Sequence, residues 1–186
     1  FCLPPGPQKD KEIAHVKRWI DEAAELFAPH IRIFGGDLPR GATKEAGIQW
    51  VADGIKEVLP RAAERGIILG LENHGGITAR AADLLAICDK VGNSPWFGIN
   101  LDTGNFHTNA YEELAMVAPR AVNVQVKVEI VDNSGRNQPV DLQKIRDILE
   151  KANYKGWVAL EYEAEEDPVK AIPFWIKKMK ETFGGC

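Results

Sequence analysis

Four polar side chains stand at the ends of four short apolar segments that follow one another along the chain. They are Glu72 in GIILGLENHGG, Asp102 in WFGINLDTGNF, Gln125 in AVNVQVKVEI and Glu161 in WVALEYE. Successive positions are 23 to 36 residues apart, which is the spacing of repeated βα units. If these segments are parallel neighbouring strands, the four side chains lie at the same edge of one sheet and converge.

Converging carboxylates predict a bound cation. Three carboxylates within a few ångströms repel one another and shift toward protonation unless a positive charge neutralises them. A set of carboxylates and one amide suits Mg²⁺ or Mn²⁺ better than Zn²⁺, which prefers imidazole and thiolate ligands. The sequence therefore predicts a divalent metal site, with Mg²⁺ or Mn²⁺ favoured, although any one of these acids alone would be explained as a helix cap or a solvated loop residue.

The alternation within each segment indicates how a sheet would present these residues. One face carries bulky apolar side chains such as Leu69, Leu71, Ile99 and Val124, and the opposite face carries the polar set. An open doubly wound sheet would be apolar on both faces, whereas a closed barrel keeps helices outside and can have a polar mouth. The pattern predicts a (β/α) TIM-type barrel with the polar face inside.

The number of predicted strands is smaller than such a barrel requires. Strands are expected at about 31–34, 67–72, 97–102, 121–127 and 157–161, with a possible stub at Phe1. Helical patterns cover about 9–27, 44–65 and 110–117, and three more helices are expected after Thr78, Asp141 and Asp167 as N-caps. A TIM barrel has eight strands. We therefore expect one barrel domain over 1–186 with five to six of the eight units, the C-terminal portion of a longer protein.

Composition excludes several classes of protein. The net charge of −4 argues against a broad surface for nucleic acid or anionic membrane. No apolar run is long enough to span a membrane. The three cysteines, Cys2, Cys88 and Cys186, are far apart and lack metal-binding spacing, which favours a reducing, cytoplasmic location without disulfides.

Further candidate residues stand near the four strand ends. His74 and Lys127 share the orientation of Glu72 and Gln125, while Asn105 and His107 follow Asp102 in a loop. Arg32 on the first strand would need a partner inside a barrel, as a substrate contact or in an ion pair. We expect these five side chains to bind substrate. Alternatively, His74 and His107 are structural loop histidines, His74 bonded to the backbone, and Lys127 is a solvated lysine at a strand end. Glu163 is equally explained as a surface acid.

The segments LENHGG, INLDTGNF, NVQVKVE and ALEYE resemble the last four strand motifs of the xylose isomerase-like TIM-barrel superfamily, a group of sugar isomerases and epimerases. The resemblance covers nearly the whole chain. It implies that Glu72, Asp102, Gln125 and Glu161 are metal ligands. Many members have histidine at the positions of Gln125 and Asn105. A glutamine at the position of Gln125 is found in the hydroxypyruvate isomerase branch.

The resemblance also implies a mechanism. A divalent metal would chelate an α-hydroxycarbonyl substrate, and Glu72 and Glu161 would remove and return a proton through a metal-bound enediolate. The chain is then an isomerase or epimerase of a sugar or keto sugar, and a homo-oligomer is possible.

Three other functions remain open. The first is a metal-dependent lyase or dehydratase acting on a keto sugar or 3-keto-glycoside. The second is a non-catalytic sugar-binding or assembly subunit. The third, endonuclease IV-like DNA repair, would require more histidine ligands and a basic groove.

Overall fold

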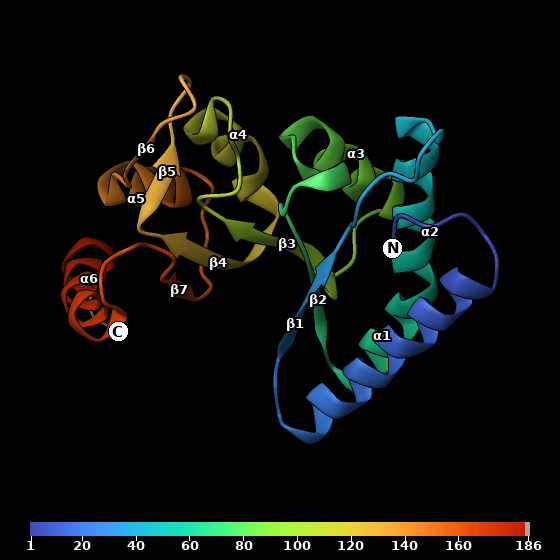
Figure 1. Cartoon of the computed structure of the whole chain (residues 1–186). Helices are drawn as coiled ribbons and strands as arrows, with labels where there is room; N and C mark the ends of the chain where they lie inside the picture. The colour runs from blue at the N-terminus through green and yellow to red at the C-terminus, as the bar shows by residue number, and fades with distance from the viewer. Residues whose placement is uncertain (185–186) are drawn as a thin grey trace. The chain divides into compact units, whose positions relative to one another are not determined.

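The computed structural model describes residues 1–184, and within them the chain forms two compact units. The first comprises Phe1–Asn100 and the second starts at Leu101. Each unit combines parallel strands with helices (Figure 1). The predicted single domain over 1–186 stays a prediction.

The first unit alternates helices with parallel strands. Strands β1, β2 and β3 pair in parallel, with Ile33 opposite Leu71 and Leu71 opposite Ile99. Its elements are α1 (Pro7–Glu25), β1 (His30–Phe34), α2 (Lys44–Arg65), β2 (Ile68–Glu72), the 3-10 helix η1 (Gly76–Thr78), α3 (Ala81–Val91) and the first four residues of β3 (Phe97–Asp102), whose last two residues belong to the second unit.

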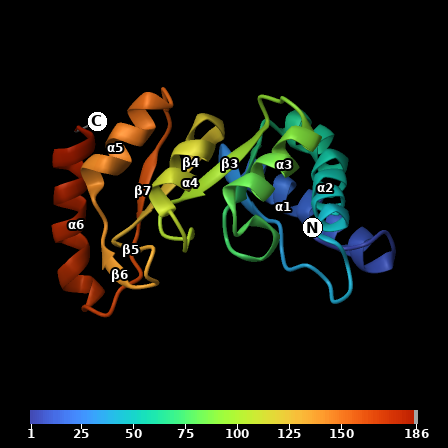
Figure 2. The ribbon, with the colours of Figure 1, turned by 90° about the horizontal axis from the view of Figure 1, so that it is seen from above.

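The apolar stripes of the helices account for the core of this unit. Helix α2 packs against both α1 and α3, and the three helices lie side by side in Figure 2. Thr43 begins α2 by accepting a hydrogen bond from the Ala46 N–H. Gly66 ends it at φ 71°, a left-handed conformation that glycine adopts without strain. The chain can therefore turn sharply from α2 into β2.

The second unit continues the same alternation and adds a hairpin. Strand β4 pairs in parallel with β7, which places Gln125 opposite Ala159 and Lys127 opposite Glu161. Its elements are α4 (Ala110–Val117), the 3-10 helix η2 (Ala118–Arg120), β4 (Ala121–Lys127), β5 (Glu129–Val131), β6 (Asn137–Pro139), α5 (Leu142–Lys151), β7 (Val158–Glu161) and α6 (Pro168–Phe183).

The predicted fold class is confirmed. Five parallel strands follow the order β1-β2-β3-β4-β7, and the first residue of each strand is within one position of the predicted one. Residues 1–184 thus supply five of the eight strands of a TIM barrel. Asp141 and Asp167 cap α5 and α6 as predicted.

Three local predictions were wrong. Thr78 does not cap α3, which starts three residues later; its hydroxyl accepts from the His74 N–H and donates to the Gly75 carbonyl oxygen. The segment after Val131, predicted as a loop, contains strand β6, which pairs antiparallel with β5. Phe1 belongs to no strand, although the next residue, Cys2, donates its N–H to the Gly35 carbonyl oxygen.

Two further predictions concern the cysteines and membrane-spanning segments. Cys2 and Cys88 are buried, and Cys186 lies outside the described residues. Among residues 1–184, none of the helices combines the length and the apolar character needed to cross a lipid bilayer.

Candidate active site

Lys127 is the centre of a charged cluster in the second unit. Its ammonium lies 2.5 Å from Glu163 Oε2, 3.7 Å from Asp102 Oδ2 and 4.0 Å from Glu161 Oε2. It also donates a hydrogen bond of 3.2 Å to Asn105 Oδ1. The Asp102 side chain is fully buried and that of Lys127 is 14% exposed, so the charges interact in partly desolvated surroundings.

Strand pairing explains why these residues meet. Lys127 ends β4 directly opposite Glu161 on β7, so their side chains share one face of the sheet. Beyond Asp102, Thr103 donates its N–H to the Gln125 carbonyl oxygen and accepts the Lys127 N–H on its hydroxyl. These two hydrogen bonds hold the end of β3 against β4.

The carboxyl of Asp102 has unusual electrostatics. Burial raises the pKa of Asp102 to about 8, and a hydrogen bond shared with Glu161 acts in the same direction. The Lys127 ammonium and the Gly104 N–H, which donates to Asp102 Oδ1 at 2.8 Å, act in the opposite direction. Two carboxyls that share a proton form a site at which another cation can replace that proton.

The charge of Lys127 is stabilised by its neighbours. Burial alone would lower the pKa of this lysine, but the hydrogen bond to Glu163 and the nearby charges of Asp102 and Glu161 prevail and raise it. Lys127 therefore stays protonated at neutral pH.

Glu72 has its own partners in the first unit. Its side chain is fully buried, with Oε2 3.4 Å from Arg32 Nε and Oε1 3.3 Å from His74 Nδ1. The guanidinium of Arg32 also lies over the Phe34 ring, 4.9 Å from its centroid, and the His74 ring contacts the same phenyl ring. The partner that Arg32 was expected to need is thus Glu72.

The remaining predicted residues are placed as follows. Asn105 contacts Lys127, whereas His107 is exposed in the loop after β3. Gln125 is half-buried on β4, two residues before Lys127. Glu163 was not among the predicted site residues, but its position two residues after Glu161 gives it the same strand parity, and that signal identifies it.

The donor set fits a divalent cation. Carboxylate oxygens of Asp102 and Glu161 lie within 4.8 Å of each other. Both are oxygen donors of the kind that Mg²⁺ and Mn²⁺ prefer, and a bound cation would favour the ionised form of Asp102, whose pKa is raised by burial and by the hydrogen bond with Glu161.

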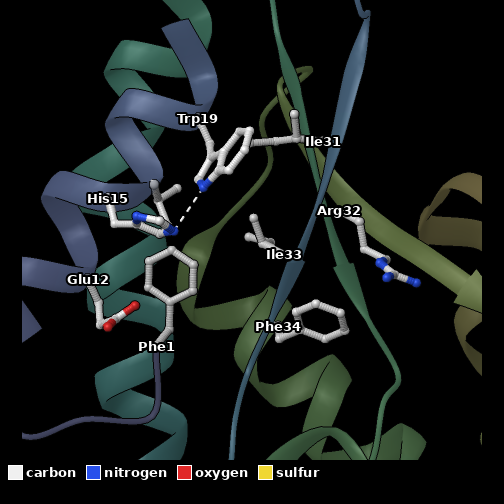
Figure 3. A pocket seen from close by; sticks show the side chains of 9 residues that line it. Phe1, Glu12, His15, Trp19, Ile31, Arg32, Ile33 and Phe34 are labelled. Atoms are coloured by element: carbon white, nitrogen blue, oxygen red, sulfur yellow. Dashed lines mark hydrogen bonds between the residues drawn. The ribbon is translucent and has the colours of Figure 1, made fainter. Parts of the chain in front are cut away.

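A separate cavity of about 450 Å³ lies in the first unit between α1 and β1 (Figure 3). Ile31 and Ile33 point toward His15 and Trp19, whose side chains share a hydrogen bond of 2.8 Å. Arg32 lies on the other side of β1 in this view. The cavity is mainly apolar, and its lining includes Arg32, which also contacts Glu72.

Curated relatives resemble the chain over most of its length. It is 32% identical to a putative hydroxypyruvate isomerase of Streptomyces coelicolor, over 92% of this chain and 66% of that protein. It is 26% identical to a putative L-ribulose-5-phosphate 3-epimerase of Haemophilus influenzae, over 97% of this chain and 71% of that protein. An inosose dehydratase of Glaesserella parasuis is 29% identical over 68% of this chain and 50% of its own length. The chain thus spans between half and about 70% of these relatives.

A solved structure and a family model agree with the fold. The structure of the IolI protein with a bound zinc atom matches with a TM-score of 0.78 and 18% identity, over 99% of this chain and 75% of that one. The model described as xylose isomerase-like TIM barrel matches residues 1–179. The chain therefore belongs to the xylose isomerase-like TIM barrel family, as its strand-end motifs predicted.

Proposed function

We propose that the protein is a divalent-metal-dependent isomerase or epimerase of a sugar or a related α-hydroxycarbonyl compound. The observation that carries this proposal is the buried Asp102 carboxyl, whose pKa is raised to about 8 and which shares a hydrogen bond with Glu161. Carboxyls with strongly raised pKa values occur at sites of proton transfer and cation binding. The isomerase and epimerase names of the two relatives with the broadest coverage support the same reaction class.

The proposal assigns a role to each residue. Glu72 and Glu161 transfer the proton, one removing it from the carbon beside the substrate carbonyl and the other returning it. Lys127, Asn105 and His74 orient substrate oxygens. Arg32 holds the Glu72 carboxylate, which it contacts at 3.4 Å, and His107 contacts substrate from its loop.

Glu72, Asp102, Gln125 and Glu161 form the proposed metal-ligand set. A bound divalent cation would polarise the substrate carbonyl and make the neighbouring C–H more acidic. All four side chains offer oxygen, which favours Mg²⁺ or Mn²⁺. The zinc atom in the IolI relative makes Zn²⁺ the metal to compare with them.

A second candidate function is dehydration or β-elimination of a keto sugar. The inosose dehydratase among the relatives favours it. The same proton-abstracting carboxylate serves both reactions, because a leaving group on the next carbon departs once the proton has been removed. The two functions differ only in whether the product has lost that group.

Product analysis in D₂O tests the proposal. The protein is incubated with Mn²⁺ and a panel of ketoses, aldoses and keto sugars, and the products are followed by NMR. Isomerisation or epimerisation introduces one solvent deuterium without loss of a group, whereas elimination releases water or an alcohol. Absence of any turnover or exchange across the panel would count against an enzyme and favour a sugar-binding subunit.

The Glu161→Gln variant supplies the mechanistic control. Loss of a positioned general base lowers turnover by about 10²- to 10⁴-fold. Glu165→Gln is the matched control, because Glu165 is an exposed acid four residues away that lies outside the proposed site. Equal activity of the two variants would remove Glu161 from the mechanism.

A further inference from the structure

The Lys127 ammonium lies unevenly among its three acidic neighbours. Its shortest contact, 2.5 Å, is with Glu163, whose side chain is 60% exposed. The fully buried Asp102 is 3.7 Å away and Glu161 is 4.0 Å away, both beyond ordinary hydrogen-bond distance. The most solvated acid of the cluster therefore makes the closest contact with the lysine.

Desolvation alone would favour a different arrangement. A cation interacts more strongly with a buried carboxylate than with a solvated one, because less water screens the pair. The observed position thus depends on the direct bond from Lys127 to Glu163, supported by the 3.2 Å hydrogen bond to Asn105.

The stem of Lys127 is also restrained. A Cβ added at Gly104 would lie 2.6 Å from Lys127 Cδ and 3.0 Å from its Cβ, so the bare glycine backbone lets the lysine chain pass. The Lys127 N–H is fixed by the Thr103 hydroxyl at 3.0 Å. With the backbone and stem held, rotation about the outer bonds of the side chain decides which acid the ammonium contacts.

We propose that Glu163 is a positioning residue that draws the Lys127 ammonium away from Asp102 and Glu161 and thereby leaves their oxygens available to a divalent cation. Without this bond the ammonium moves onto the Asp102 and Glu161 carboxyls, which share a hydrogen bond, and competes there with the metal. The inference rests on the proposed function in one respect, namely that Asp102 and Glu161 are metal ligands.

A double-mutant cycle read by Mn²⁺ titration tests this role. Glu163→Gln should weaken Mn²⁺ binding by roughly tenfold, within the range of coupling between side chains in contact. In a Lys127→Met background the same substitution should change the affinity by less than about twofold, since no ammonium remains to compete. Glu163→Asp, which keeps the charge, should restore much of the affinity lost in Glu163→Gln.

Two results would overturn the proposal. An equal loss of affinity with Lys127 present and in the Lys127→Met background would mean that Glu163 acts only through its negative charge. Crystal structures of the metal-free protein and of its Glu163→Gln variant provide a readout that needs no metal. The proposal predicts that Lys127 Nζ moves to within about 3.2 Å of Asp102 Oδ2 in the variant, and an unmoved ammonium would contradict it.

The same experiments separate failure of this inference from failure of the proposed function. If the unmodified protein binds no Mn²⁺, the proposed function fails, and the crystal structures alone decide whether Glu163 positions Lys127. If Mn²⁺ binds but the cycle is additive, the proposed function stands and the role of Glu163 is wrong.

Discussion

Asp102 combines complete burial with one ammonium neighbour and one carboxyl neighbour. Its folded-state pKa of about 8 lies above the ordinary value of 3.8, so folding favours the protonated form. A group of this kind contributes stability that is fully present below pH 3.8 and is lost as the pH rises toward about 8. A bound cation reverses this preference, because it binds the ionised carboxylate.

The pH dependence of metal affinity follows from this pKa. Below pH 8 a proton on Asp102 competes with the metal, so Mn²⁺ affinity should fall by up to about tenfold per pH unit between pH 8 and pH 6. Isothermal titration calorimetry in buffers of different ionisation enthalpy would measure both the affinity and the released proton. An affinity that stays constant over this range would contradict the assignment of Asp102 as a protonated ligand.

Gly104 gives a second prediction at the residue scale. Gly104→Ala places a methyl group 2.6 Å from Lys127 Cδ, and such overpacking destabilises by about 1–3 kcal/mol. Urea unfolding measures the loss. Shortening Lys127 to alanine removes the 2.6 Å contact with Cδ and leaves the 3.0 Å contact with Cβ, so Gly104→Ala should cost less in a Lys127→Ala background. The same loss in both backgrounds would show that the glycine is needed for another reason.

The junction between β3 and β4 positions the cluster at the scale of elements. Thr103 is buried, and its N–H and hydroxyl bond to the backbone of Gln125 and Lys127. Hydrogen bonds of Thr103 therefore hold the strand end that carries Asp102 against the strand end that carries Lys127. The register, rather than any single ion pair, brings them together.

Substitution of Thr103 tests this junction. Thr103→Val keeps the shape but leaves the Lys127 N–H without its acceptor, at a cost of about 1–3 kcal/mol. Thr103→Ser keeps the hydroxyl and serves as the matched control. Hydrogen exchange at the Lys127 amide should accelerate in the valine variant only; equal protection in both variants would show that the hydroxyl bond does not hold the strand end.

The sequence predicted the parallel strands well, because each alternates bulky apolar residues with small or polar ones. It did not predict β5 and β6, since the DNSGRNQ segment that follows β5 is polar and all three residues of β6 are exposed, which leaves that strand without a burial pattern. Thr78 was wrongly predicted as the N-cap of α3, because its hydroxyl forms hydrogen bonds with the backbone of His74 and Gly75 in the preceding turn. Sequence spacing does not distinguish such bonds from a helix cap.

The candidate site was predicted in part for a similar reason. Strand parity identified Asp102, Glu161 and Lys127, which the structure brings together within the second unit. It also placed Arg32 and Glu72 on one face, but only the structure shows that they pair. Strand parity also places Glu163 beside Glu161, but the positioning role proposed for Glu163 rests on its distance from Lys127, which no spacing rule provides.

At the scale of the whole molecule, the chain carries two sets of acidic residues in two compact units, Glu72 in the first and Asp102 with Glu161 in the second. The family it belongs to is built as a TIM barrel, and the chain spans 66% of the Streptomyces relative. The central proposal is that Asp102 and Glu161, both in the second unit, bind a divalent metal at a site that serves proton transfer.

Stoichiometric Mn²⁺ binding, followed by electron paramagnetic resonance, tests this claim most directly. The unmodified protein should bind one Mn²⁺ per chain, and Asp102→Asn and Glu161→Gln should each weaken binding by more than about tenfold, as expected for loss of a charged ligand. Glu165→Gln is the control and should bind like the unmodified protein. Unchanged Mn²⁺ affinity in both Asp102→Asn and Glu161→Gln would contradict the account, because neither carboxylate would then be a metal ligand.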